Sequence, residues 1–177
     1  RGLGDVYKRQ EYIHASDKES FQKLSNMSGN FLNEDSELEE LILNDRVDII
    51  ICATSGFSGL KAACIAARSG KKILLANKES IVAGGDLILP IAKENNTQII
   101  PIDSEHNAIF QCLLGERGTD DVQKIIITAS GGPFLNSSVI DLKNVTVAEA
   151  LNHPNWNMGS KVTIDLATLV NKCLELI

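Results

Sequence analysis

The sequence has no excess of basic residues, since 17 Lys and Arg stand against 23 Asp and Glu and give a net charge of −6. Nucleic acids and anionic membrane surfaces repel a chain of this charge, so we expect neither as a partner. The sequence also has no run of about 18 apolar residues, the length that a membrane-spanning helix needs. With 44% hydrophobic residues in 177 positions, the chain can still bury an ordinary core.

The cysteines form no recognisable metal or disulfide pattern. Cys52, Cys64, Cys112 and Cys173 are scattered through apolar contexts, and no CxxC pair occurs. Such cysteines are typical of reduced, buried thiols in a cytoplasmic protein, which is what we expect here.

The two ends are unusual. The chain begins at Arg1 instead of Met, and residues 1–10, "RGLGDVYKRQ", have neither the apolar stretch of a signal peptide nor the Ser-rich pattern of a transit peptide. We expect these ten residues to be a non-native leader. The helical pattern "TLVNKCLELI" runs to the last residue with no stop signal after it. The expectation is an internal piece of a longer protein.

Apolar runs alternate with helical patterns along the chain. Four runs predict strands, at residues 47–54, 73–76, 97–102 and 123–128. The first, "VDIIICAT", is continuous enough for a strand buried on both faces. The segments between the strands predict helices, as does the polar stretch 17–44. Strands that alternate with helices are typical of a parallel α/β architecture.

Polar clusters follow each predicted strand. They are "TSG", "NKES", "DSEHN" and "ASGGP" in chain order. In open parallel sheets, ligands bind at the carboxyl ends of the strands, so the sequence predicts a ligand site at this edge. Lys78 in "NKES" could there meet a phosphate or a polarised oxygen, or could belong to an ordinary solvated helix start.

The cluster "DSEHN" contains two carboxylates, Asp103 and Glu105, that are two residues apart. In an extended segment this spacing puts both on one side. Carboxylates aimed together repel unless a cation or a proton lies between them, and oxygen ligands suit Mg²⁺ or Mn²⁺. The alternative is a solvated loop in which Asp103 caps the next helix.

The last segment, residues 163–177, predicts one amphipathic helix. Its polar face holds Thr168, Asn171, Lys172 and Glu175, and its apolar stripe holds Leu166, Val170, Cys173 and Ile177. One interpretation is a helix with its polar face in water. In the other, Glu175 supplies a third carboxylate to the same cation.

Two loops have further binding character. Gly131 and Gly132 in "TASGGPF" would let backbone N–H groups approach an anion, although Gly-Gly-Pro is also an ordinary turn. The segment 153–161, "HPNWNMGSK", holds the only tryptophan, Trp156. It is either a lid that closes over a substrate or a loop with Trp156 as a core anchor.

Five sequence blocks occur in a familiar order: "LLANKESIVAGG", "PIDSEHNAIFQCL", "TASGGPF", "HPNWNMGSKVTID" and "NKCLE". Together with "GLKAACIAARSGK", the chain from about residue 47 to its end resembles the 1-deoxy-D-xylulose-5-phosphate reductoisomerases. The resemblance implies an α/β fold, with the later part of a Rossmann-like NADPH-binding domain at 11–102. The start of an α/β catalytic domain is expected at 103–177.

The resemblance also implies roles for particular residues. The metal ligands would be Asp103, Glu105 and Glu175. Substrate contacts would come from Lys78, Ser104, Glu105, Ser130, His153, Asn171, Lys172 and Glu175, of which Lys78, Glu105 and His153 would be catalytic. Positions that touch NADPH are Asn77, Glu79 and Gly159, and the segment around Trp156 is similar to a flap.

The implied activity is the conversion of 1-deoxy-D-xylulose 5-phosphate to 2-C-methyl-D-erythritol 4-phosphate in non-mevalonate isoprenoid biosynthesis. In the family, a retroaldol/aldol rearrangement precedes hydride transfer from NADPH, with Mn²⁺ or Mg²⁺ and Co²⁺ as a further candidate. A homodimer and a bacterial cytoplasmic location are implied, with a plastid as the alternative. Family chains are more than twice as long and begin with a Gly-rich strand–turn–helix. We therefore expect residues 11–177 alone to bind NADPH weakly or not at all and to be inactive.

Two positions depart from the family pattern. "DSATLMNKGLE" reads "DLATLVNKCLE" here, so Leu166 replaces a phosphate-contacting Ser and Cys173 replaces a Gly. One alternative is a homoserine-dehydrogenase-like oxidoreductase that uses NADPH, although the "DSE" and "NKCLE" blocks disfavour it. The other is a degenerate paralogue without turnover, for which Leu166 is the only support.

Overall fold

The computed structural model describes residues 12–14, 19, 22, 30–32, 35–115 and 119–177. Strands β1 (Tyr12–His14) and β2 (Asn30–Leu32) pair in parallel, and helix α3 (Asp35–Leu43) follows. The helix predicted over 17–44 is confirmed at α3 but wrong at 30–32, where Asn30 is a poor helix former and Phe31 favours a strand. Much of the remainder of this prediction, within 17–34, lies outside the described residues. The predicted leader, residues 1–10, lies outside the described residues.

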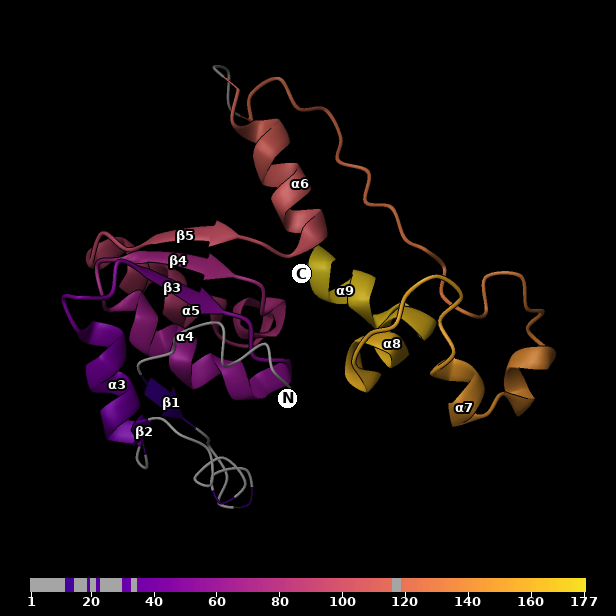
Figure 1. Cartoon of the computed structure of the whole chain (residues 1–177). Coiled ribbons are helices and arrows are strands. Elements are labelled where there is room, and N and C mark those ends of the chain that lie inside the picture. The colour runs from indigo at the N-terminus through magenta and orange to yellow at the C-terminus, as the bar shows by residue number, and fades with distance from the viewer. Residues whose placement is uncertain (1–11, 15–18, 20–21, 23–29, 33–34, 116–118) are drawn as a thin grey trace.

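The sheet that organises the site has three parallel strands. They are β3 (Ile49–Cys52), β4 (Lys72–Leu75) and β5 (Gln98–Pro101), in that spatial order, as Figure 1 shows. Ile50 lies beside Ile73, and Ile73 beside Ile99. The predicted parallel α/β arrangement is confirmed for these three strands.

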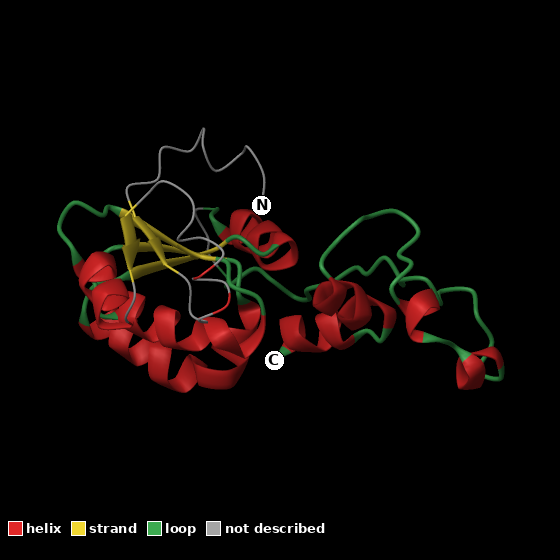
Figure 2. Ribbon diagram, turned by 60° about the horizontal axis from the view of Figure 1, so that its bottom comes forward, coloured by secondary structure: helices red, strands yellow, loops and turns green. Residues whose placement is uncertain are grey.

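The helical crossovers cover one face of this sheet. The 3-10 helix η1 (Gly56–Gly59) leads into α4 (Leu60–Ala67), and α5 (Lys78–Glu94) joins β4 to β5. Both helices lie along the same face of the sheet, below the strands in Figure 2. Small alanines on α4 let it approach α5 closely, and Ile73 and Ile88 complete the buried core. This packing fixes the start of α5 at the carboxyl ends of the strands.

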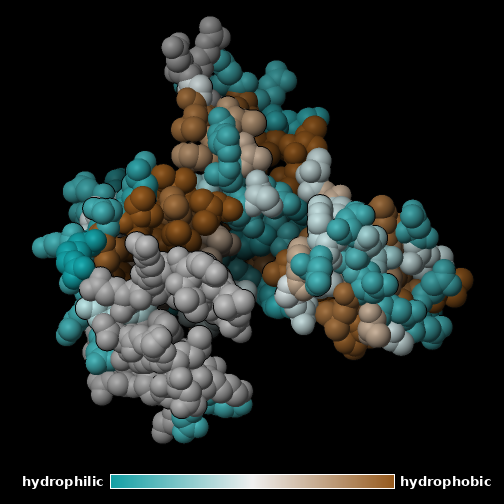
Figure 3. Space-filling view, in the orientation of Figure 1, coloured by the Kyte–Doolittle hydropathy of each residue, from teal (hydrophilic) through white to brown (hydrophobic). Residues whose placement is uncertain are grey.

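Strand β3 is buried on one face only, contrary to the prediction. Ile50 and Cys52 pack into the core, whereas Ile49 and Ile51 are 50% and 63% exposed. Apolar residues gather over the strands in the view of Figure 3. Because a continuous apolar run gives no period, it could not tell one buried face from two.

The second part of the chain begins with α6 (Ser104–Leu113), directly after β5. The predicted strand at 123–128 is wrong, because these residues form no ladder with any strand in the described part of the chain. Ile125 and Ile126 are consequently 52% and 74% exposed. An apolar run becomes a strand only where a neighbour accepts its backbone hydrogen bonds.

Short helices follow this extended segment. They are η2 (Asp141–Asn144) and α7 (Val147–Ala150). The side chain of Thr146 accepts from the backbone of Glu149, whose carboxylate bonds back to the Thr146 N–H, so a capping box starts α7.

The last segment is two helices and not one. Helix α8 (Ser160–Ala167) ends at Thr168, and α9 (Val170–Leu176) begins after Leu169, which has a left-handed φ of 62°. The burial of α9 also decides between the two interpretations of this segment, against a polar face in water and for a Glu175 side chain that joins the carboxylates. Asn171 and Glu175 are buried, whereas Val170 and Leu176 are exposed. The reason is that α9 packs against the start of α5, where its partners are charged.

All four cysteines are free. Cys52 is buried and Cys64 is half-buried, but Cys112 and Cys173 are exposed, so the expectation of buried thiols is wrong for the last two. Burial raises the pKa of the Cys52 and Cys64 thiols. Within the described residues, every helix is too short or too polar to cross a membrane.

Candidate active site

The polar clusters after β3, β4 and β5 meet at one edge of the sheet, as predicted. Asn77, the N-cap of α5, donates from Nδ2 to the carbonyl oxygen of Thr54 and, at 2.9 Å, to that of Gly56. Lys78 Nζ lies 2.8 Å from Asp103 Oδ2. Asn77 is 3% exposed, so its hydrogen bonds are buried contacts that connect the cluster after β4 to the cluster after β3.

Three carboxylates converge beside these clusters. Asp103, Glu105 and Glu175 each offer an oxygen, and these oxygens all lie within 4.8 Å of one another. Asp103 is extended and Glu105 lies in the first turn of α6, so a helix start, and not a strand, brings the pair together. Asp103 occupies the N-cap position but makes no side-chain cap hydrogen bond. Its carboxylate is directed to the cluster instead.

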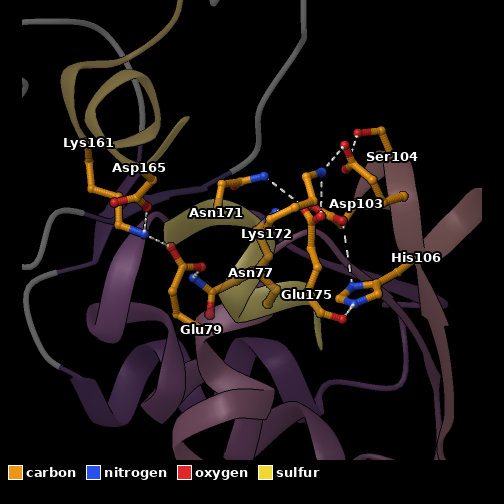
Figure 4. A network of polar contacts seen from close by, with 12 residues as sticks. Asn77, Glu79, Asp103, Ser104, His106, Lys161, Asp165, Asn171, Lys172 and Glu175 are labelled. Atoms are coloured by element: carbon orange, nitrogen blue, oxygen red, sulfur yellow. Dashed lines mark hydrogen bonds and ion pairs between the residues drawn. The ribbon is translucent and has the colours of Figure 1, made fainter. Parts of the chain in front are cut away.

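Two lysines cross-link the three carboxylates, and Figure 4 labels Lys172, Asp103 and Glu175 of this group. Lys78 Nζ lies 2.8 Å from Asp103 Oδ2 and 2.6 Å from Glu175 Oε1. Lys172 Nζ lies 2.8 Å from Glu105 Oε1 and 2.6 Å from Glu175 Oε2. Three anions and two cations leave a net charge of −1, which favours one further cation.

Contacts within the cluster keep both lysines and Glu105 ionised. Burial lowers the pKa of Lys78 and of Lys172, but hydrogen bonds to the carboxylates outweigh it and raise both. Burial raises the pKa of Glu105, yet the hydrogen bonds from Lys172 and from Ser104, whose Oγ lies 2.7 Å away, bring it to about 2. Lys78, Lys172 and Glu105 therefore carry their full charge near neutral pH.

Glu175 is held from several sides. Its side chain is 0% exposed, Asn171 Nδ2 donates to its Oε1 at 2.6 Å, and its backbone oxygen lies 3.1 Å from His106 Nε2. A carbonyl oxygen only accepts, so His106 carries a hydrogen on Nε2. His106 Nδ1 lies 3.6 Å from Asp103 Oδ1, so this ring contacts two of the three acidic residues.

Two carboxylate oxygens of the cluster lack hydrogen-bond partners. They are Asp103 Oδ1 and Glu175 Oε2. Glu175 Oε2 does face Lys172 Nζ at 2.6 Å, but as an ion pair without hydrogen-bond geometry. Asp103 Oδ1 has no comparable close partner, and a buried oxygen of this kind is unfavourable unless something satisfies it. A set of three carboxylates with such an oxygen fits a hard divalent cation.

A second group surrounds Ser130 and His153. His153 Nδ1 accepts from the backbone N–H of Asn155 and of Trp156, each at 3.2 Å. The remaining ring nitrogen, Nε2, then carries the hydrogen and donates to Ser130 Oγ at 3.2 Å. Gly132 N–H donates to the same Oγ at 3.2 Å. With two donors on its oxygen, the Ser130 hydroxyl is oriented to donate outward, which suits a phosphate.

Trp156 is not a core anchor, because it is 56% exposed. Its ring stacks on that of His153, with centroids 5.0 Å apart and an interplanar angle of 13°. The segment around it is thus tied to the Ser130 group.

The glycine loop packs against the end of α8. Gly131 and Gly132 have φ values of +80° and +63°, and a Cβ on Gly132 would lie 2.9 Å from the Leu166 carbonyl oxygen. Both the left-handed backbone and this close approach therefore require glycine at position 132. Leu166 itself is half-buried.

A third group lies at the start of α5. Glu79 Oε2 accepts from Asn77 Nδ2 at 3.2 Å, and Glu79 Oε1 contacts Lys161 Nζ. Lys161 also lies 2.6 Å from Asp165 Oδ2, and Gly159 is the N-cap of α8. Of these residues, sequence reasoning named Asn77, Glu79 and Gly159.

Sequence reasoning missed Lys161, Asp165 and His106. Lys161 and Asp165 are four residues apart in a helix, which was a usable signal for a charged pair. His106 follows Asp103 by three residues at a helix start. In neither case could the sequence show which distant residue these side chains reach.

Two family models match the chain. The model described as 1-deoxy-D-xylulose 5-phosphate reductoisomerase matches residues 6–85, and the model of that enzyme's C-terminal domain matches residues 99–177. The chain belongs to the 1-deoxy-D-xylulose 5-phosphate reductoisomerase family. The family models thus span both the three-stranded sheet and the acidic cluster.

Individual reductoisomerases agree with this assignment. The one from Francisella tularensis subsp. novicida is 50% identical over 145 residues, which is 81% of this chain and 38% of that relative. The one from Clostridium tetani is 46% identical over 173 residues, or 94% of this chain and 45% of the relative. This chain thus spans less than half the length of these relatives.

Solved reductoisomerase structures have the same fold. A DOX-P reductoisomerase in complex with NADPH, fosmidomycin and magnesium superposes with a TM-score of 0.84 at 41% identity, over 97% of this chain and 45% of the other. The Zymomonas mobilis reductoisomerase in complex with NADPH gives 0.77 at 39% identity, over 94% and 43%. These likenesses do not favour the homoserine-dehydrogenase-like alternative.

Proposed function

We propose that this chain carries the metal site, much of the substrate site and part of the cofactor site of an NADPH- and divalent-metal-dependent reductoisomerase. It would convert 1-deoxy-D-xylulose 5-phosphate to 2-C-methyl-D-erythritol 4-phosphate. The observation that carries the proposal is the convergence of Asp103, Glu105 and buried Glu175 with oxygens within 4.8 Å. Two lysines in contact with these carboxylates add the donors that a phosphorylated, oxygen-rich substrate needs.

Asp103, Glu105 and Glu175 would hold a Mn²⁺ or Mg²⁺ ion. Such an ion supplies Lewis-acid polarisation of the substrate's ketone and hydroxyl oxygens. The two carboxylate oxygens without hydrogen-bond partners support this assignment. His106, in contact with both Asp103 and the Glu175 backbone, would keep the ligands oriented.

The lysines and polar side chains would orient the sugar phosphate. Lys78, against Asp103 and Glu175, would place an ammonium beside the reacting oxygens. Lys172 and Asn171 would bind the phosphate from α9, and Ser130 would donate its hydroxyl hydrogen from the glycine loop. His153 orients that hydroxyl through its Nε2–H. Ser104 would add a hydroxyl at the start of α6.

The cofactor would lie on the other side of the same strand ends. Asn77, Glu79 and Gly159 are the proposed contacts to NADPH, which supplies the hydride. The exposed Trp156 on its segment before α8 would cover the bound substrate and exclude water. The division into residues 11–102 and 103–177, a homodimer and a bacterial cytoplasmic location are further parts of the proposal.

The test uses the full-length enzyme, by which we mean a protein of the relatives' length that carries this sequence. NADPH absorbance is followed with the sugar phosphate and Mn²⁺, and product is identified by mass spectrometry. We expect NADPH oxidation that requires both substrate and metal. NADPH oxidation without metal, or none at all under any of these conditions, would refute the proposal, and the latter would favour a degenerate paralogue.

A further inference from the structure

The start of α5 meets both of the last two helices through neighbouring residues. Lys78 pairs with Glu175 on α9, and Glu79 pairs with Lys161 on α8. The first contact belongs to the acidic cluster already described. The second lies outside it, and Lys161 has no role among the proposed ligands.

Lys161 occupies a particular place in the chain. It lies in the first turn of α8, two residues after Gly159, and is the last residue of the segment 153–161 that carries Trp156. Its Nζ contacts Glu79 Oε1 and lies 2.6 Å from Asp165 Oδ2, as Figure 4 shows. The ammonium therefore links the end of that segment to the strand-end turn of the sheet.

Glu79 is held on both carboxylate oxygens. Asn77 Nδ2 donates to Oε2 at 3.2 Å, and Lys161 holds Oε1. Asn77 in turn bonds the Thr54 and Gly56 carbonyls. The Glu79 side chain is thus held by Lys161 on one side and, through Asn77, by the turn after β3 on the other.

The charges in this group argue against direct anion binding by Lys161. One ammonium faces two carboxylates, Glu79 and Asp165, whose side chains are 18% and 14% exposed. Burial raises the pKa of Glu79, but hydrogen bonds from Lys161 and backbone N–H groups lower it overall. Glu79 therefore stays ionised, and the formal charges of two carboxylates and one ammonium sum to −1, which does not attract a phosphate.

We propose that Lys161 is a positioning residue that fixes the Glu79 carboxylate and the start of α8, and through them the nicotinamide cofactor. This inference rests on the proposed function, since Asn77, Glu79 and Gly159 are the proposed NADPH contacts. Without the Lys161 ammonium, the half-buried Glu79 carboxylate loses its cationic partner and α8 loses its contact to α5. Glu79 and the start of α8 then become less precisely positioned for the cofactor. The acidic cluster keeps its own ion pairs with Lys78 and Lys172.

The experiment compares Lys161→Met with Lys143→Met in the full-length enzyme. Lys143 is an exposed lysine on η2, so it controls for loss of one positive charge. NADPH affinity is measured by fluorescence titration without substrate, and KM is measured for both substrates. For Lys161→Met we expect about a tenfold rise in the NADPH dissociation constant and KM, with the KM of the sugar phosphate within about twofold of wild type. Lys143→Met should leave all three unchanged.

A double-mutant cycle with Glu79→Gln tests whether Lys161 acts through Glu79. We expect the double variant to bind NADPH no more weakly than the weaker single variant, because the two residues form one contact. Lys161→Arg keeps the charge and should restore most of the affinity. If the Met variant does not fold, as judged by its melting temperature, Lys161→Gln is measured in its place with the same expectations.

Three outcomes overturn the inference: unchanged NADPH affinity, an equal rise in both KM values, or fully additive effects of the two substitutions. These outcomes are separable from failure of the proposed function. If the wild-type enzyme turns over no sugar phosphate, the proposed function fails. The NADPH titrations alone still decide the role of Lys161 in cofactor binding.

Discussion

Lys78 Nζ lies 2.6 Å from Glu175 Oε1, although 97 positions separate the two residues in the chain. The contact joins the first turn of α5 to the last turn of α9, where Glu175 is fully buried. A buried carboxylate without a partner is costly, so this pair fixes where α9 ends relative to the sheet. It also places Glu175 beside Asp103, and thereby completes the acidic cluster.

The first prediction concerns the metal. Asp103→Asn in the full-length enzyme should weaken Mn²⁺ binding by at least about tenfold, because a neutral amide replaces one of three carboxylates. Isothermal titration calorimetry measures the affinity directly. Asp86→Asn, an exposed position on α5, is the matched control and should bind as wild type. Equal affinity of Asp103→Asn and wild type would remove Asp103 from the ligand set.

The second prediction concerns the substrate phosphate. Lys172→Ala should raise the KM for the sugar phosphate far more than that for NADPH, because Lys172 lies at the acidic cluster and not near Glu79. Steady-state kinetics with each substrate varied in turn measures both constants. A parallel rise in the two would show that Lys172 holds the fold and not the phosphate.

The third prediction concerns the same variant, Lys172→Ala, but expects tighter binding of the metal instead of weaker binding of the substrate. Lys172→Ala removes a positive charge 2.8 Å from Glu105 and 2.6 Å from Glu175. In the absence of substrate, Mn²⁺ should therefore bind about threefold to tenfold more tightly, and the gain should shrink at high salt. Calorimetry at low and high ionic strength provides the measurement. Weaker binding would mean that Lys172 is needed to orient Glu175.

The fourth prediction concerns Leu166, which replaces a serine of the family pattern. Leu166→Ser adds a hydroxyl donor at the end of α8, beside the glycine loop. One hydrogen bond to a charged phosphate contributes about 1.5 kcal/mol, so the KM of the sugar phosphate should fall by roughly tenfold. Leu176→Ser at an exposed site should have no effect. An unchanged KM for Leu166→Ser would show that the phosphate does not reach this position.

The fifth prediction concerns acid stability. The pKa of Glu105 is lowered from 4.5 to about 2, so its carboxylate stabilises the fold at pH values above 4.5. That contribution is lost as pH falls from 4.5 through about 2, because the folded state then takes up the proton. Urea unfolding of the metal-free full-length enzyme at a series of pH values should show this loss. Glu105→Gln should show a shallower decrease over that window, and an identical slope would contradict the assignment.

The sheet and its ligand edge could be predicted because their signals are local. Apolar runs marked the three strands, and polar residues directly after each one marked the edge at which Asn77, Lys78 and Asp103 meet. Parallel strands align their carboxyl ends, so the meeting of these residues follows from topology alone. The roles of Ser130 and His153 rested on resemblance and remain proposals.

The arrangement of α8 and α9 could not be predicted, because its causes are distant. Leu169 gives no sequence signal for a left-handed residue, and the local pattern continues smoothly through it. The burial of Asn171 and Glu175 depends on Lys78, which lies on another helix. Hydrophobic periodicity therefore indicated the wrong buried face. The strand predicted at 123–128 was wrong for a similar reason, because strand pairing depends on a neighbouring strand that the local sequence does not show.

The left-handed residue Leu169 separates α9 from α8, so the two helices are joined at a single strained position. Leucine in this conformation costs about 1–2 kcal/mol, so the surrounding contacts must hold it in place. Asn171, Lys172 and Glu175 all lie on α9, so a rotation of this helix at Leu169 would shift the three together. Lys161, which precedes Leu169, would stay with α8. The third carboxylate and two of the proposed phosphate contacts, Asn171 and Lys172, thus lie on one short helix, whereas the Lys161–Glu79 contact belongs to another.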